Sequence, residues 1–421
     1  MNKKFGSINY IIDTHHLGLY VKEARLRHGY RLTEVAHEVC SVSVLSRIES
    51  GICDPTPVLF EKLAKKLKMR FPESDRQDPI EIFKTMIYCH NTQSMEDLLQ
   101  DDCLYDYELP LLSFLMAVKK CDLKKAEKYK SIVDNWSNHL NLKEKQIYTL
   151  FNGIYYFLKY QWIEGARFLE LSLKAANQRG IEEPLLYIEI AKYYFKTERN
   201  HLGFVFIKRA HDLFQKLLAS KYTIECVVIW CDEYIKLGEL DVASEKLEQL
   251  HHLQRLANDE MLANDILSFS GRISQLRGQG DIAEQIFFKL ANKNIKNLSD
   301  SCLISIIEFY YSQGHLNQIL DFINGLESNI KKMSYKIQTL LEYYYYKATN
   351  EAHYDYDFEI FLLDDAIPQA RDDLDLANIT MYVGDLVKLY EIKKSNKGIA
   401  MTYAALESFR NKLSNMQTIQ K

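Results

Sequence analysis

The stretch IWCDEYIKLGELDVASEKLEQL, residues 229–250, contains two amphipathic segments separated by a turn at Gly238. Apolar residues recur at spacings of three and four on both sides of this glycine, which is the pattern of two amphipathic helices. Glycine readily ends a helix in the left-handed conformation. The small residues Cys231 and Ala243 face each other in this arrangement and would let the two helices pack closely. The stretch therefore predicts an antiparallel helix pair.

The same helix pair recurs along the chain, in residues 151–173, 190–210, 269–290 and 306–326. Aligning the second helices places small or apolar anchors at spacings of 37, 40, 40 and 36 residues, namely at Ala166, Gly203, Ala243, Ala283 and Ile319. The pattern resembles tetratricopeptide repeats, and KLGELDVASEKL, residues 236–247, is closest to their consensus. Weaker units near 107–136, 332–371 and 373–415 bring the predicted number to about eight. The repeats predict a right-handed α-solenoid with a concave channel.

Composition agrees with an all-α protein. The chain has 421 residues with only 16 Gly and 7 Pro, and its 28 Tyr and 20 Phe supply bulky packing. No apolar run is long enough to span a bilayer, so we predict a cytoplasmic protein without membrane contact. Its 8 cysteines are scattered without a CxxC pair, which argues against metal sites and disulfides. Catalytic motifs such as HExxH, GxSxG and the Walker loop are missing from the sequence. We expect neither an enzyme nor a cofactor.

The N-terminal part has its own pattern and charge. Four short amphipathic segments cover residues 17–29, 32–40, 42–51 and 55–69, separated by turn signals. Residues 1–72 carry 12 Lys and Arg against 7 Asp and Glu, whereas the rest of the chain is acidic, with 41 against 50. This predicts a small helical head that meets a polyanion, attached to a larger body that does not.

The residue order in the head resembles the Cro/cI-type helix-turn-helix across all four segments, with Arg25, Ala36, Ser46, Ile48, Glu49 and Gly51 at matching places. CSVSVLSRIESG, residues 40–51, resembles the version typical of peptide-pheromone receptors of Gram-positive bacteria, the Rgg, PlcR, NprR and PrgX group. Where that family usually opens its second helix with Ser or Thr and then Gln, this chain has Arg31 and Leu32, so we expect Thr33 to cap that helix instead.

This motif predicts the residues that meet double-stranded DNA. Leu45 and Ile48 are the inward positions of the third segment, so its start and outer side would face the major groove. Ser41 or Ser43 could equally be a helix cap without contact to DNA. The predicted DNA-binding residues are Arg25, Arg27, Arg31, Thr33, Ser41, Val42, Ser43, Val44, Ser46 and Arg47.

The repeat pattern predicts the residues of the channel, because positions eleven before each anchor lie on the inward face of the first helix. A mainly apolar row lies one turn to either side of these positions, and the lower row includes Phe151 and Ile304. The resemblance implies that such channels bind secreted, re-imported signalling peptides, with asparagines holding the peptide backbone, and Asn152 lies beside the predicted face. Charges on a solenoid's inner surface could also be merely solvated. The predicted peptide-binding residues are Asn152, Tyr155, Lys192, Phe195, Asp232, Arg272, Gln275, Glu308 and Tyr311.

The sequence thus divides into an N-terminal extension (1–16), a helix-turn-helix domain (17–70), a linker (71–79) and a repeat domain (80–421) for peptide binding and dimerisation. We predict a homodimeric transcription regulator in which a quorum-sensing peptide modulates DNA binding. Two alternatives stay open at this point: the repeats bind a protein partner such as a response regulator, as related Rap-type proteins do, or they serve only the dimerisation of a constitutive repressor.

Overall fold

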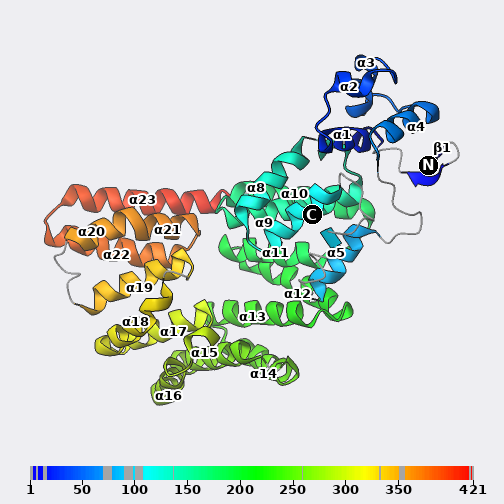
Figure 1. The fold of residues 1–421 in the computed structure, drawn as a ribbon. Helices are drawn as coiled ribbons and strands as arrows, with labels where there is room; N and C mark the ends of the chain where they lie inside the picture. Colours follow the sequence, from blue (N-terminus) through cyan, green and yellow to red (C-terminus); the bar gives the residue numbers. More distant parts are fainter. Residues whose placement is uncertain are drawn as a thin grey trace. The chain divides into compact units, whose positions relative to one another are not determined.

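The structure is a computed structural model, and it describes residues 3–5, 8–12, 17–69, 78–89, 98–99, 108–135, 137–257, 259–330, 333–349, 356–416 and 419 (Figure 1). These residues are predominantly helical. The chain forms two compact units, one of residues 1–189 with 419–421 and one of residues 190–418. Most of the predicted linker, residues 71–77, lies outside the described residues.

Four helices form the head: α1 (Leu17–Arg27), α2 (Leu32–Ala36), α3 (Val42–Glu49) and α4 (Pro57–Lys66). Leu45 and Ile48 of α3 are buried, as predicted from the sequence. Helices α1 and α3 cross at Gly18, where a Cβ atom would lie 1.9 Å from the carbonyl oxygen of Ile48. Only glycine permits this approach, so the crossing point is determined by one residue.

The N-terminal extension contains the antiparallel strands β1 (Lys3–Phe5) and β2 (Ile8–Ile12). This short hairpin lies in the predicted N-terminal extension, and the helix-turn-helix head and the repeats form the predicted all-α fold. INYII is rich in isoleucine and tyrosine, which are enriched in strands, and the segment is too short for a stable helix.

The first unit continues with α5 (Pro79–Tyr88), α7 (Glu108–Lys119), α8 (Leu123–Asp134), α9 (Leu142–Leu158) and α10 (Trp162–Arg179), with a short 3₁₀ helix at Ser137–His139. Helix α7 packs with α8, and α9 packs with α10. Asn141 caps α9 by accepting hydrogen bonds from two backbone amides of its first turn, and α10 ends at Gly180 in the left-handed conformation. Helix α11 (Pro184–Lys196) contains the boundary between the units.

The second unit is a series of helix pairs. Its helices after α11 are α12 (Asn200–Lys216), α13 (Ser220–Lys236), α14 (Leu240–Ala257), α15 (Glu260–Leu276), α16 (Gly280–Ala291), α17 (Asp300–Ser312), α18 (Leu316–Ile330), α19 (Tyr335–Ala348), α20 (Tyr356–Phe361), α21 (Ile367–Asp372), α22 (Leu376–Ile392) and α23 (Asn396–Ser414), with a 3₁₀ helix at Ile295–Asn297. The five anchors of the sequence alignment are all buried. The turn of the opening stretch falls at Gly238, whose φ is 76°.

One repeat departs from the helix pair. Between α20 and α21 the chain makes a π turn over Leu362–Ala366, in which the amide of Ile367 donates to the carbonyl of Leu362. Pro368 follows directly and has no amide hydrogen to continue the helical ladder. A wider turn before the proline accommodates this loss, since single π turns inside helices commonly absorb such an interruption.

Candidate DNA-binding surface and inner face of the repeats

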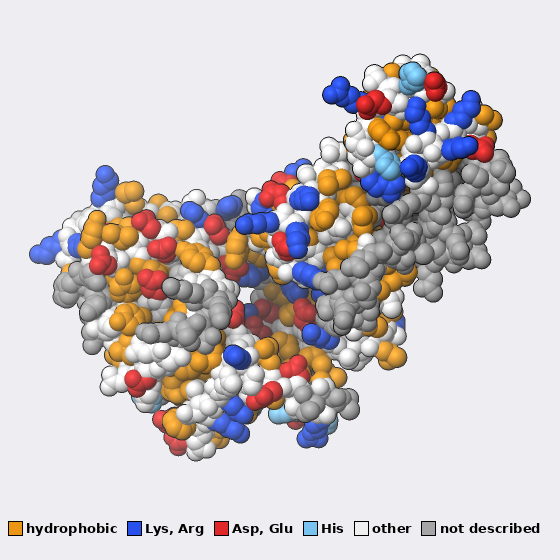
Figure 2. Space-filling model, viewed as in Figure 1, with side chains coloured by type: hydrophobic (Ala, Val, Ile, Leu, Met, Phe, Trp, Pro, Cys, Tyr) orange, Lys and Arg blue, Asp and Glu red, His pale blue; other side chains and the backbone are white. Residues whose placement is uncertain are grey.

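The predicted DNA-binding helix α3 presents a continuous exposed edge. Its N-cap is Ser41, whose hydroxyl oxygen accepts a hydrogen bond from the amide of Val44 at 3.2 Å. Val42 and Val44 are 40% and 37% exposed, although valine side chains are usually buried. Ser43, Ser46 and Arg47 are exposed beside them. Lys and Arg side chains are spread over the visible face of the head (Figure 2). This edge combines hydroxyls, methyl groups and a cation, which are the groups that contact phosphates and base edges.

Arg25 has a structural partner. Its guanidinium donates two hydrogen bonds to the carboxylate of Glu49 in α3, both at 2.7 Å, and a third to the carbonyl of Tyr30 at 2.9 Å. Only 11% of its side chain is exposed. Such a fork-to-fork pair is strong and directional. Arg25 therefore joins α1 to α3, and the predicted phosphate contact does not fit its position.

The other predicted residues before α3 lie on the surface. Arg27 is exposed and donates to the carbonyl of Lys68 at 3.4 Å. Arg31 is the N-cap residue of α2, and its amide donates to the carboxylate of Glu34 at 2.5 Å. The prediction that Thr33 caps this helix is wrong, because Thr33 already lies within the first turn of α2. It is exposed, as is Arg31, so both stay available to DNA.

In the first unit, the predicted channel residues are covered by other helices. Asn152 is fully buried, and its amide nitrogen donates to the carbonyl of Tyr148 at 2.9 Å. Tyr155 is 2% exposed and its ring packs on Phe114 of α7. Neither residue is positioned to hold a peptide in this structure, in contrast to the prediction.

Helix α5, which the repeat pattern did not reveal, lies against the neighbouring part of α9. Phe83 of α5 contacts Phe151, a residue of the predicted apolar row, with ring centroids 5.7 Å apart. Lys84 is buried and its ammonium lies 2.5 Å from the carboxylate of Glu183, which also accepts a hydrogen bond from Tyr88. Lys143 of α9 forms ion pairs with Asp78 and Glu81. The sequence PIEIFKTMIY has the spacing of an amphipathic helix and could have indicated α5.

In the second unit, Phe195 belongs to the contact between α11 and α12. Its ring packs edge to face on Phe204, with centroids 5.1 Å apart. A Cβ atom added to Gly203 would lie 2.5 Å from the same ring. Phe195 therefore fills the space that the small anchor leaves, and the prediction that it lines the channel does not match this packing. Lys192, on the same helix, forms an ion pair with Glu225 of α13 at 2.8 Å.

A group of charged residues from six segments meets on one face of this unit; we call it the inner-face cluster, and it consists of Lys196, Asp232, Arg272, Glu308, Lys336, Asp373 and Asp375. Arg272 of α15 donates to Asp232 of α13 at 2.5 Å. Lys336 of α19 bonds to Asp373 and Asp375, at 3.1 and 2.8 Å.

Lys196 of α11 also reaches this cluster, donating to the carboxylate of Asp373 at 2.8 Å and to its carbonyl at 3.1 Å. The helices that supply the cluster are far apart in the sequence, so the unit curves around it.

The charges of the cluster shift one another's pKa values. Burial alone would raise the pKa of Asp232, but Lys236 and Arg272 together hold it below its ordinary value. Asp375 behaves in the same way, with Lys336 as the main opposing charge. Burial lowers the pKa of Lys196 despite the attraction of Asp373. The carboxyl groups of Asp232 and Asp375 are therefore ionised at neutral pH, in surroundings partly removed from water.

Glu308 is the exception in the cluster. Within the described part of the chain, its carboxylate has no hydrogen bond and no ion pair, and its side chain is exposed. Desolvation by the surrounding protein raises its pKa, and Asp375 adds to this, while Arg272 and Lys336 act in the opposite direction. A side chain that water reaches and that protein nevertheless desolvates is at the wall of a concave surface.

The remaining predicted residues extend this face. Gln275 of α15 donates to the hydroxyl of Ser312 at 2.9 Å, and Tyr311 of α17 packs edge to face on Tyr344 of α19. The pattern missed Lys336, Asp373 and Asp375, because they lie in or after the irregular repeat, where the anchor spacing could not be extended.

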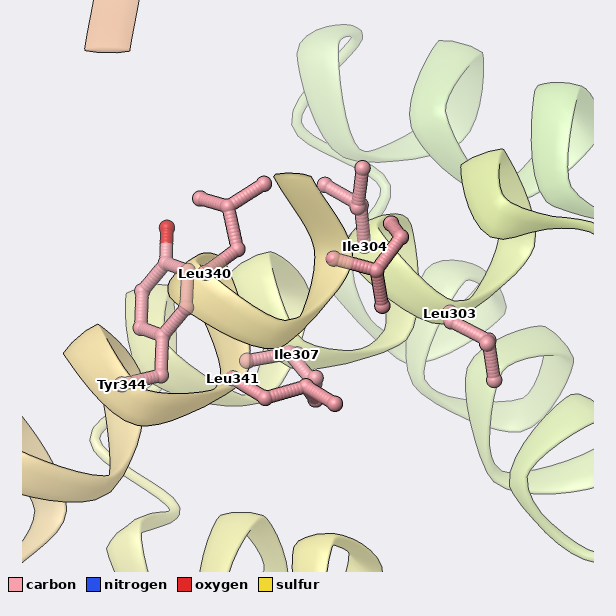
Figure 3. A pocket seen from close by; sticks show the side chains of 7 residues that line it. Leu303, Ile304, Ile307, Leu340, Leu341 and Tyr344 are labelled. Atoms are coloured by element: carbon pink, nitrogen blue, oxygen red, sulfur yellow. The ribbon is translucent and has the colours of Figure 1, made fainter. Parts of the chain in front are cut away.

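A small apolar pocket opens between α17 and α19 (Figure 3). Ile304 and Ile307 extend into it from α17, and Leu340 and Tyr344 extend into it from α19; Leu303, Ile337 and Leu341 complete the lining. Ile304 belongs to the apolar row predicted one turn below Glu308. The predicted pattern of charged and apolar rows therefore holds in α17.

Among the described residues, no group of three or more His, Cys, Asp and Glu side chains is placed to hold a metal ion. None of the helices in these segments is long and apolar enough to cross a membrane.

The head and the helix pairs define a class: proteins with a helix-turn-helix domain followed by tetratricopeptide-like repeats. Residues 21–73 match the helix-turn-helix family model. The chain is similar to the transcriptional activator NprA of Geobacillus stearothermophilus, with 22% identity over 410 residues that cover 90% of this chain and 100% of the relative.

Solved structures with the same fold include a quorum sensor, both without and with its cognate peptide. The apo form of the quorum sensor NprR from B. thuringiensis has a TM-score of 0.57 at 16% identity, covering 79% of this chain and 97% of that one. NprR in complex with its cognate peptide NprX has 0.60 at 19%, covering 78% and 97%. A Rap protein complexed with competence and sporulation factor has 0.62 at 14%, covering 80% and 98%. These similarities confirm the helical fold and the resemblance to the peptide-receptor group drawn from the sequence.

Proposed function

We propose that this protein is a DNA-binding transcription regulator and that its repeats bind a short signalling peptide that modulates DNA binding. The exposed edge of α3 supports DNA binding, because hydroxyls, methyl groups and Arg47 lie together along a helix whose N-terminus is capped by Ser41. The similarity to NprA, a transcriptional activator, supports it.

The second half rests on the inner-face cluster and the pocket beside it. Peptide sites combine apolar walls with a few polar groups that determine orientation. NprR, a similar structure, has been solved with a peptide. A peptide that binds one conformation of the repeats better than another would change the DNA affinity by its differential binding energy, typically about 1–3 kcal/mol.

We assign residues 17–70 to DNA binding and 80–421 to peptide binding and dimerisation, as the sequence predicts. A homodimer places two heads on a near-palindromic site, which is how helix-turn-helix proteins usually bind. Among the predicted DNA-binding residues we retain Arg27, Arg31, Thr33, Ser41, Val42, Ser43, Val44, Ser46 and Arg47. Among the predicted peptide-binding residues we retain Lys192, Asp232, Arg272, Gln275, Glu308 and Tyr311.

The test selects DNA from a random duplex pool with the full-length protein and then measures affinity for the selected site by fluorescence anisotropy, with and without a pool of random hexapeptides. We expect a selected inverted repeat and an affinity that the pool changes by about fivefold or more. Failure to select any sequence would refute DNA regulation. A selected site whose affinity no peptide changes would favour the constitutive repressor, and recovery of a bound protein in place of peptides would favour a partner-binding role.

A further inference from the structure

Glu308 is the member of the inner-face cluster that is left without a partner. Asp232 already binds Arg272 and Lys236, and Asp373 and Asp375 already bind Lys336. The nearby cations are thus engaged with other carboxylates. The one carboxylate of the cluster with neither an ion pair nor a hydrogen bond in the described residues is that of Glu308. A cation from outside the protein would complete the cluster.

The apolar pocket lies next to this carboxylate. Ile304 and Ile307 line the pocket. Glu308 lies one helical turn after Ile304, so the side chains of Glu308 and Ile304 share a face of α17, with their Cβ atoms about 5–6 Å apart. Burial raises the pKa of Tyr344, on the other wall of the pocket, and the negative charge of Glu308 adds to this. Burial and the charges of Asp375 and Glu308 also raise the pKa of Tyr382, whose buried hydroxyl has no hydrogen-bond partner among the described residues.

We propose that α17 and α19 recognise a peptide that carries a positive charge next to a large apolar side chain. The positive group of the peptide pairs with the carboxylate of Glu308, and its apolar side chain enters the pocket. This rests on the proposed peptide-binding function and adds the chemical class of the ligand. An acidic peptide is disfavoured at this place, because it would bring a second negative charge to an unpaired carboxylate.

The positive charge has two possible sources, the peptide's α-ammonium group or a Lys or Arg side chain. Both donate hydrogen bonds to a carboxylate, and charge-assisted bonds of this kind are worth more than neutral ones. Two pools of random hexapeptides distinguish them, one with free and one with acetylated N-termini. Acetylation removes the α-ammonium group and leaves the side chains unchanged.

The experiment incubates the full-length protein with each pool and identifies the retained peptides by mass spectrometry. We expect peptides with a cation beside Leu, Ile, Val or Phe to be enriched by about tenfold, the effect of a charged hydrogen bond. Glu308→Gln should abolish the preference for the cation, and Glu308→Lys should replace it by a preference for Asp and Glu. Glu248→Lys, an equal charge change at an exposed position of the second helix α14, should leave the preference unchanged.

Three results would overturn the inference. Peptides retained without a preference for cations would refute it and leave peptide binding intact, as would a preference that survives Glu308→Lys. Loss of the preference in Glu248→Lys as well would assign it to net charge and not to this site. Retention of no peptide by the unaltered protein would refute the inference and the proposed peptide-binding function together. Circular dichroism of each variant shows that it is folded.

Discussion

Arg25 and Arg272 show what residue spacing does and does not determine. The helix-turn-helix motif predicted Arg25 to contact DNA, whereas the structure pairs it with Glu49, and the repeat spacing placed Arg272 on the inward face of its helix. Their partners Glu49 and Asp232 come from other helices, 24 and 40 positions away, and periodicity within one helix contains no information on such pairs. The sequence therefore predicted the inward face of Arg272 and Glu308, but only the packed structure separates the charges that have partners from Glu308.

Gly18 gives the sharpest prediction for a single residue. Gly18→Ala places a methyl group where the carbonyl of Ile48 lies, so α1 and α3 must separate and the Arg25–Glu49 pair must stretch. Overpacking of this kind costs typically about 1–3 kcal/mol. We expect a lower melting temperature of the head and weaker DNA binding, measured by calorimetry and anisotropy. Gly325→Ala is the control, since nothing lies near its Cβ, and it should be neutral or stabilise α18 by up to about 1 kcal/mol. Equal melting temperatures for Gly18→Ala and the unaltered protein would contradict the close crossing.

Asp375 predicts a dependence of stability on pH. Lys336 holds the pKa of Asp375 below its ordinary value against the effect of burial. The stability from this pair is therefore fully present above the unfolded pKa of about 3.9 and is lost as the pH falls through the lower folded value. Asp375→Asn should lower the urea midpoint at pH 7, and the difference from the unaltered protein should shrink towards pH 3. Asp321→Asn, at an exposed position of α18, should show no such trend. A difference that is constant with pH would mean that the pair contributes nothing through ionisation.

At the scale of the element, α3 shows that a short sequence can determine both a helix and its orientation. Leu45 and Ile48 bury one side, and Ser41 caps the N-terminus of the helix by accepting a hydrogen bond from the amide of Val44. The exposed side then follows from geometry, which is why the sequence predicted it. The repeat containing α20 and α21 was predicted less well, since Pro368 and the π turn before it interrupt the period on which the alignment depends.

Helix α3 also carries the prediction for DNA recognition. Arg47→Ala and Ser43→Ala should each weaken binding to the selected site by about 1–3 kcal/mol if their side chains contact bases. Each variant should also lose the preference for one particular base pair of that site. Val42 and Val44 present methyl groups, so Val44→Ser should reduce discrimination for a thymine. Lys62→Ala in α4 is the control for loss of charge alone, and it should weaken all sequences alike. Unchanged affinity in both Arg47→Ala and Ser43→Ala would remove α3 from base recognition.

At the scale of the molecule, the repeats of the second unit return on themselves. Lys196 at the end of α11 binds Asp373 between α21 and α22, 177 positions later. Arg199, which precedes α12, donates to the carbonyls of Ser414 and Met416 at the end of α23. The spacing of the anchors predicted a stack of helix pairs with good accuracy. It did not predict this closure, because the curvature of a stack depends on small rotations between repeats that sequence period does not determine.

The closure can be opened by one substitution. Lys196→Gln removes the charge that holds Asp373 from α11 and leaves Lys336 bound to the same carboxylate, so the ends of the unit should separate while each helix pair stays folded. Amide hydrogen exchange should become faster at the start of α22 and at the end of α23, the segments that contact Lys196 and Arg199.

Lys336→Gln is the control. The same loss of charge breaks a contact between successive repeats, so exchange should become faster in α19 and at the start of α22 but not at the end of α23. Faster exchange at the end of α23 in both variants would mean that the cluster stabilises the unit as a whole, and unchanged exchange in Lys196→Gln would show that the closure does not depend on this ion pair.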